Sequence, residues 1–122
     1  MIQGIVTSDR EPIVQMVAQD AIGQDHKFDA VVDTGFTGWL TLPPHTIAAL
    51  GLSWKELGAA ILADGSLIDF DVYEASVLWD GQWVTIPVDE ADADPLMGMR
   101  LMQGYRILIE DVDGGSVQIE RI

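Results

Sequence analysis

Residues 28–43 read FDAVVDTGFTGWLTLP, and they are the most informative stretch of the chain. The two valines before Asp33 predict a strand that enters the core, and the Asp33 carboxylate stands at its end. Gly35 and Gly38 follow, and glycine lets a backbone turn sharply because it has no Cβ to clash. An isolated Asp-Thr-Gly is usually only a turn. Between a buried strand and the apolar return of residues 39–42, it becomes a candidate functional site.

The composition indicates one folded domain with a strong negative charge. The 122 residues include 20 acidic and 6 basic side chains, for a formal charge of −14. This length predicts a single domain over residues 1–122. A hydrophobic fraction of 48% with 21% charged residues favours a globular protein over a disordered one. Because this charge repels polyphosphate backbones and anionic lipid heads, we expect no nucleic-acid partner and no membrane partner.

The residue types present narrow the chemistry to carboxylates. Cysteine is absent, which excludes disulfides, thiolate metal sites and cysteine nucleophiles. Only His26 and His45 carry imidazole, so a serine-histidine triad or a multi-histidine metal site has little to draw on. No secretory signal is evident, and no apolar run approaches the roughly 18 residues of a membrane helix. We therefore expect a cytoplasmic protein whose chemistry uses aspartate or glutamate.

Apolar and polar residues alternate along most of the chain, which predicts short strands. A phase change within residues 67–79 predicts a bulge near residues 72–74. Pro43 and Pro44 before an apolar segment, with Gly51 after it, predict a short helix. Many strands with one or two short helices indicate a mostly β domain, either a small closed barrel or a sandwich. The expected strands cover residues 2–7, 12–22, 27–32, 39–42, 67–79, 83–88, 105–110 and 116–122.

The segment VVDTGF, residues 31–36, resembles the active-site motif of the retropepsin-like aspartic proteases. In that family two apolar residues precede Asp-Thr/Ser-Gly, and an apolar pair followed by glycine comes well downstream. Leu96-Met97-Gly98 is similar to this second element and stands in the same order. The resemblance covers nearly the whole chain. It implies a mostly β fold, a small closed barrel of the retropepsin-like (acid protease) type.

Residues 61–66, ILADGS, lie between the two motifs, where the family has its flap, a hairpin that closes over the substrate. The resemblance makes Ala63, Asp64, Gly65 and Ser66 the candidate substrate-binding residues of a flap. The segment has a single glycine and no flap tyrosine, and it equally fits an ordinary Asp-Gly turn.

The resemblance also implies a mechanism and an assembly. Aspartic proteolysis uses two carboxylates that share one proton around a water molecule. The chain has only one Asp-Thr-Gly, so the implied enzyme is a homodimer with Asp33 from each chain at its axis. Thr34 would hydrogen-bond across that axis, and Gly35 would let the backbones approach. No metal and no organic cofactor is implied, and the substrate would be an extended peptide or protein segment.

Two other functions stay open at this point. Phe36 and Thr37 replace the small residues that are common after Asp-Thr-Gly, which predicts an altered cleft floor. With the plain flap, they leave open a non-catalytic dimeric or peptide-binding module of the same fold. The third function is that of a structural β-barrel in which Asp33 only caps a turn.

The charge is unevenly placed along the sequence. Residues 56–99 contain ten acidic residues and no basic one. This distribution predicts a negative flap and cleft, a preference for neutral or basic peptides, and better dimerisation or activity at mildly acidic pH or raised salt. The same residues equally fit a solvated surface with no role in binding.

Overall fold

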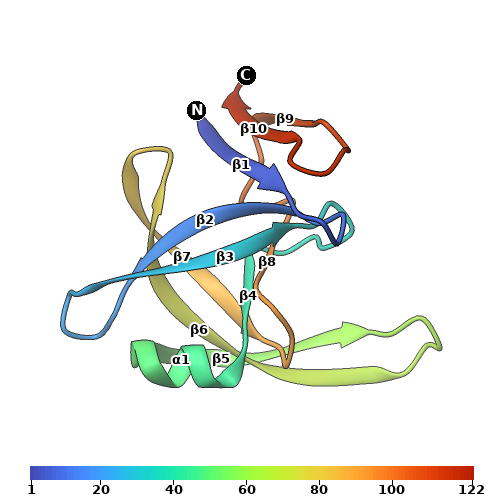
Figure 1. Ribbon diagram of the computed structural model, residues 1–122. Coiled ribbons are helices and arrows are strands. Elements are labelled where there is room, and N and C mark those ends of the chain that lie inside the picture. Colours follow the sequence, from blue (N-terminus) through green and yellow to red (C-terminus); the bar gives the residue numbers. More distant parts are fainter.

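The computed structural model describes residues 1–122 and contains ten strands and one short helix (Figure 1). The predicted mostly β class is confirmed. The strands are β1 (Ile2–Val6), β2 (Pro12–Gln19), β3 (Asp25–Val32), β4 (Leu40–Leu42), β5 (Ser53–Ile61), β6 (Leu67–Trp79), β7 (Gln82–Glu90), β8 (Leu96–Met97), β9 (Tyr105–Ile109) and β10 (Ser116–Arg121), and the helix is α1 (Pro44–Leu50).

Six of the strands close into a ring. They pair in the order β6, β7, β4, β8, β3 and β2, and the pairing of Ala18 with Val77 joins β2 back to β6. The pairs β3–β8 and β4–β7 are parallel, whereas the other pairs in the ring are antiparallel. The closed β architecture expected from the sequence is therefore present as a ring of strands around one core.

The core fills this ring with side chains from alternate strand positions. On β2, Val14, Met16 and Ala18 are buried, and the residues between them are more exposed. This is the period of two that a strand with one buried face requires. The core cluster has 20 buried residues, including Leu40 from β4 and Met97 from β8. The two short strands β4 and β8 lie beside the Asp33 loop (residues 33–39) and are therefore anchored by fully buried side chains.

Two extensions leave the ring. β5 pairs only with β6, and this hairpin projects to the lower right in Figure 1. On the other side of the sheet, β1 continues from β2, and β10 and β9 follow it. The two chain ends therefore lie close together at the top of Figure 1. β5 and β9 are the edge strands of the whole sheet.

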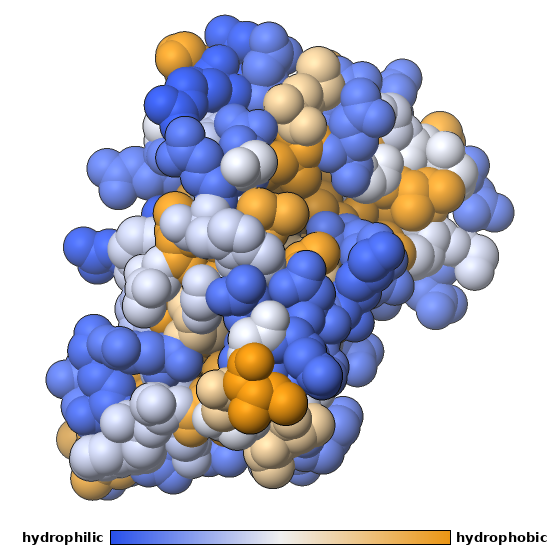
Figure 2. Space-filling view, turned by 90° about the vertical axis from the view of Figure 1, so that its left-hand side faces the viewer, coloured by the Kyte–Doolittle hydropathy of each residue, from blue (hydrophilic) through white to orange (hydrophobic).

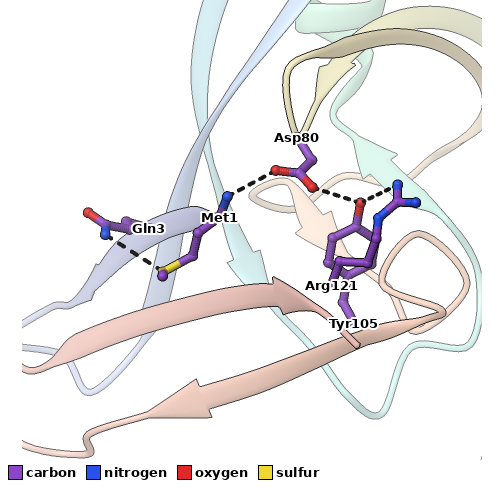
Figure 3. Close-up of polar contacts among 5 residues, drawn as sticks. All are labelled: Met1, Gln3, Asp80, Tyr105 and Arg121. Atoms are coloured by element: carbon purple, nitrogen blue, oxygen red, sulfur yellow. Dashed lines mark hydrogen bonds and ion pairs between the residues drawn. The ribbon is translucent and has the colours of Figure 1, made fainter.

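A polar network ties the terminal strands to the turn between β6 and β7 (Figure 3). Asp80 in this turn accepts hydrogen bonds from the Met1 amino group and from the Tyr105 hydroxyl, each at 3.1 Å. These two bonds lower the pKa of Asp80. Arg121 donates to the Tyr105 hydroxyl at 3.3 Å and also lies over the Tyr105 ring. The network ties the two chain ends and β9 to the β6–β7 turn of the ring.

The helix confirms the sequence-based prediction for this segment. Pro44 is its first residue, where the missing N–H of proline costs no hydrogen bond. Ile47 and Leu50 are buried against the core, and Gly51 ends the helix in the left-handed conformation, with φ 62°.

Two sequence-based expectations need correction. The strand β5 was not predicted from the sequence. Eight of its nine residues are exposed and only Gly58 is partly buried, so no alternation of apolar and polar residues marks it. The predicted bulge in β6 is wrong: the extra residue is Lys55 on β5, and β6 pairs with β7 without interruption. The apolar phase of β6 changes because Ala75, Val77 and Trp79 face the core of the ring, whereas its first half belongs to the projecting hairpin.

Figure 2 shows the face on the left of Figure 1, where hydrophobic residues gather across the upper half and hydrophilic residues surround them. Exposed apolar side chains include Ile22 in the turn between β2 and β3, and Leu78 and Trp83, which pair across β6 and β7. The chain contains no helix with the length and apolar character needed to span a membrane.

Candidate active site

The Asp33 loop is held by three strands of the ring. β3 runs parallel to β8, with Val31 opposite Leu96 and Val32 opposite Met97. The Asp33 N–H continues this pairing, because it donates to the Met97 carbonyl at 2.9 Å. β4 pairs with the other side of β8. The two motifs that stand far apart in the sequence are therefore neighbours in the structure.

One oxygen of the Asp33 carboxylate is fixed by the backbone. Asp33 Oδ1 accepts a hydrogen bond from the Gly35 N–H at 2.9 Å, and the Asp33 carbonyl accepts one from the Phe36 N–H at 3.2 Å. No hydrogen bond or ion pair within the chain engages Asp33 Oδ2. Asp33 is partly exposed, and Thr34 and Gly35 are exposed. The loop thus orients this carboxylate and leaves one of its oxygens free for a ligand.

Three backbone hydrogen bonds join the loop to the segment after β8. Gly98 donates to Trp39, Met99 to Phe36 and Arg100 to Gly38, at 2.8–3.0 Å. A methyl group on Gly98 would lie only 2.1 Å from the Gly38 carbonyl oxygen, closer than atoms can pack. Gly98 is therefore required by the close approach of two backbones.

The ring of Phe36 covers this contact. A methyl group would lie 2.7 Å from the ring at Gly98 and 2.6 Å from it at Gly38, so the ring rests against both glycines. Phe36 is only partly buried, and its exposed side lines the largest cleft in the molecule. The departure from a small residue at this position therefore places an aromatic surface in the cleft.

The cleft has a volume of about 860 Å³ and lies between the Asp33 loop and the β5–β6 hairpin. Figure 1 shows the loop after β3 above this hairpin. Its wall comes from four segments and two single residues: Gly35–Gly38 of the loop, Ala59–Ile61 of β5, Ile68–Asp71 of β6, Asp89–Asp92 at the end of β7, Thr41 and Pro44.

The predicted flap residues occupy the tip of the β5–β6 hairpin. Asp64 Oδ1 accepts hydrogen bonds from the backbone N–H and the hydroxyl of Ser66, and Gly65 has φ 84°. Ala63, Asp64, Gly65 and Ser66 do not line the cleft of the single chain, which is covered by the two strands of the hairpin instead. The sequence motif thus located the hairpin but missed the strand residues that face the cleft.

The cleft wall is acidic. Asp69, Asp71, Asp89, Glu90 and Asp92 contribute to it, and no lysine or arginine does. Asp71 accepts a hydrogen bond from the Trp54 indole at 3.1 Å. Burial raises the pKa of Asp89, which is partly buried. No group of three or more histidine and acidic side chains is arranged to hold a metal ion.

Comparison with solved structures shows a retropepsin-like fold. The chain is similar to a retropepsin-like aspartic protease from Rickettsia conorii, with a TM-score of 0.62 and 18% identity over 98% of this chain and 89% of that one. It is also similar to EIAV protease in complex with an inhibitor, with a TM-score of 0.62 and 16% identity over 79% of this chain and 88% of the other. No protein-family model matches the chain, and no curated protein matches it in sequence. At these identities the likeness concerns the fold.

Proposed function

We propose that residues 1–122 form one subunit of a homodimeric aspartic endopeptidase. The observation that carries the proposal is the state of Asp33: backbone hydrogen bonds orient its carboxylate, one oxygen has no partner within the chain, and the loop that holds it lines an open cleft from Gly35 onward. The retropepsin-like fold supports the same function, because the similar structures include a retropepsin-like aspartic protease and EIAV protease.

The mechanism requires a second carboxylate. One carboxylate removes a proton from a water molecule as its oxygen attacks the scissile carbonyl carbon, and a protonated partner donates to the carbonyl oxygen. The tetrahedral intermediate then collapses, the C–N bond breaks, and the amine leaves with a proton. Two carboxyl groups in contact share one proton because like charges at that distance do not both ionise. Asp33 supplies one group per chain, so a two-fold dimer supplies the pair.

The neighbouring residues have supporting roles in this proposal. Thr34 is exposed beside Asp33 and its hydroxyl makes no hydrogen bond within the chain, which leaves it free to bond to the loop of a second subunit. Gly35 gives the backbone N–H that holds Asp33 Oδ1. Ala63, Asp64, Gly65 and Ser66, at the hairpin tip, would close over the cleft. An extended peptide would bind as an added strand between the hairpin and the loop.

Substitution of Asp33 tests the proposal. A quenched fluorogenic peptide library is incubated with the protein at pH values from about 3 to about 8, which include the ordinary carboxyl pKa of about 4 and the raised values of perturbed carboxyl groups. Cleavage is measured with and without a transition-state inhibitor of the pepstatin type. Asp33→Asn should reduce cleavage at least about 1,000-fold, because it removes the carboxylate that activates the water. The matched control is Asp113→Asn, an equal change of charge in the exposed turn between β9 and β10. Undiminished cleavage by Asp33→Asn would remove Asp33 from the mechanism.

A non-catalytic peptide-binding module is the second candidate function. It is favoured by the Phe36 ring, which occupies the cleft wall next to Gly38 and Gly98. A protein that binds the library peptides and forms a dimer, yet cleaves none of them over the whole pH range, would support this function over the endopeptidase.

A further inference from the structure

The cleft contains a corner where an aromatic ring and an unpaired carboxylate meet. A methyl group at Gly38 would lie 2.6 Å from Phe36 Cζ and 3.5 Å from Asp89 Oδ2. Phe36 Cζ and Asp89 Oδ2 therefore both lie close to the point where a Cβ at position 38 would stand. All three residues line the cleft, and a side chain at position 38 would collide with the Phe36 ring.

Asp89 differs from the acidic side chains that form ion pairs within the chain. Asp20 pairs with His26 at 2.8 Å, and Asp111 pairs with Arg10 at 2.9 Å. No hydrogen bond or ion pair within the chain engages the Asp89 carboxylate, although this residue is partly buried. A partly desolvated carboxylate without a partner costs stability, so its place in a cleft wall points to a partner that arrives from outside.

The surroundings of Asp89 fix the charge of that partner. β7 places Glu90 next to it in sequence, and Asp92 follows in the same wall. No basic residue lines the cleft, so nothing there competes for the Asp89 carboxylate. A cation is favoured at this position and an anion is repelled.

The shape and chemistry of the corner fix the kind of cation. A planar guanidinium can stack on an aromatic ring and donate two hydrogen bonds to a carboxylate, and its aliphatic stem can cover apolar surface. An ammonium group meets the charge requirement but not the planar one. Phe36 offers the ring and Asp89 the carboxylate, both next to Gly38.

We propose that Phe36, Gly38 and Asp89 form a subsite for the arginine side chain of a bound peptide. The guanidinium stacks on the Phe36 ring and pairs with the Asp89 carboxylate, and lysine binds there less tightly. The inference rests on the proposed function, since it places a peptide in the cleft, and it names the substrate class: peptides with a basic residue that reaches this corner.

The test measures binding without cleavage. Fluorescein-labelled peptide pools with arginine at one fixed position are titrated against the Asp33→Asn protein and followed by anisotropy. Matched pools carry citrulline, which has the shape of arginine and no charge. We expect the arginine pool to bind about tenfold more tightly at one position of the peptide, as for a charge-assisted hydrogen bond in a partly buried site.

The added substitutions assign that preference to the corner. Asp89→Asn should abolish the difference between the arginine and citrulline pools, Asp89→Glu should retain part of it, and Phe36→Leu should reduce it by a few fold. Asp113→Asn should leave it unchanged. Folding of each variant is verified by circular dichroism and thermal unfolding.

Three results would overturn the subsite: no binding of any pool, equal binding of arginine and citrulline pools, or a preference that survives Asp89→Asn. Cleavage by the unsubstituted protein is recorded separately with the same pools. An arginine preference without cleavage would reject the endopeptidase and keep the subsite. Cleavage without an arginine preference would reject the subsite alone.

Discussion

The two walls of the cleft are built differently. The Asp33 loop is joined to the segment after β8 by backbone hydrogen bonds, and Gly38 in the loop and Gly98 after β8 leave no room for a side chain against the Phe36 ring and the backbone. β5 pairs only with β6, and residues 67–71 of β6 pair only with β5; on this projecting hairpin Leu57, Ile61 and Leu67 are 67–74% exposed. One wall fixes a carboxylate, and the other is a projecting hairpin with few buried side chains, which gives it the lower local stability.

The largest expected effect separates the two walls by the same substitution. Gly98→Ala should destabilise the fold by at least about 3 kcal/mol, because the new methyl group would lie 2.1 Å from the Gly38 carbonyl oxygen. Gly65→Ala at the hairpin tip meets no atom within 4 Å and should cost only about 1 kcal/mol, the price of its positive φ. Chemical denaturation measures both. Equal losses would contradict the difference between a fixed and a loose wall.

A smaller effect concerns charge. Burial raises the pKa of Asp89, so the folded state favours the protonated acid and is less stable at neutral pH than it would be with a neutral group. Asp89→Asn should therefore stabilise the protein at pH 7, by no more than about 1 kcal/mol. The gain should shrink as pH falls through the pKa of folded Asp89, where the carboxyl group becomes neutral in the unsubstituted protein.

The hairpin supplies the control for this second prediction. Asp69→Asn makes the same change of charge on an exposed cleft residue of β6 and should leave the midpoint of thermal unfolding unchanged. Thermal unfolding of the three proteins between about pH 4 and 7 decides the matter. If Asp89→Asn lowered the midpoint of thermal unfolding, the carboxylate would have a stabilising partner within the chain, and the inference that its partner is a ligand would be wrong.

The sequence predicted the fixed wall better than the loose one. Asp33 and Gly98 stand in motifs whose apolar pairs and glycines are required where β8 pairs with β3 and β4. The sequence pattern of these motifs is therefore visible in the chain. β5 is exposed over almost its whole length, so burial imposes no alternation from which a strand could be predicted. Phe36 and Asp89 come from two segments that are distant in the sequence, and nothing in the sequence near either residue indicates that the other lies beside it.

Subunit mixing tests the central claim most directly, that two chains each contribute Asp33 to one dyad. Unsubstituted protein and Asp33→Asn are mixed at constant total concentration, allowed to exchange subunits, and assayed for peptide cleavage, with sedimentation recording the mass. If both Asp33 residues are needed, activity at equal amounts falls to about one quarter, because only dimers of two unsubstituted chains are active. A fall to about one half, as for a site complete within one chain, or a monomeric mass with full activity, would contradict the account.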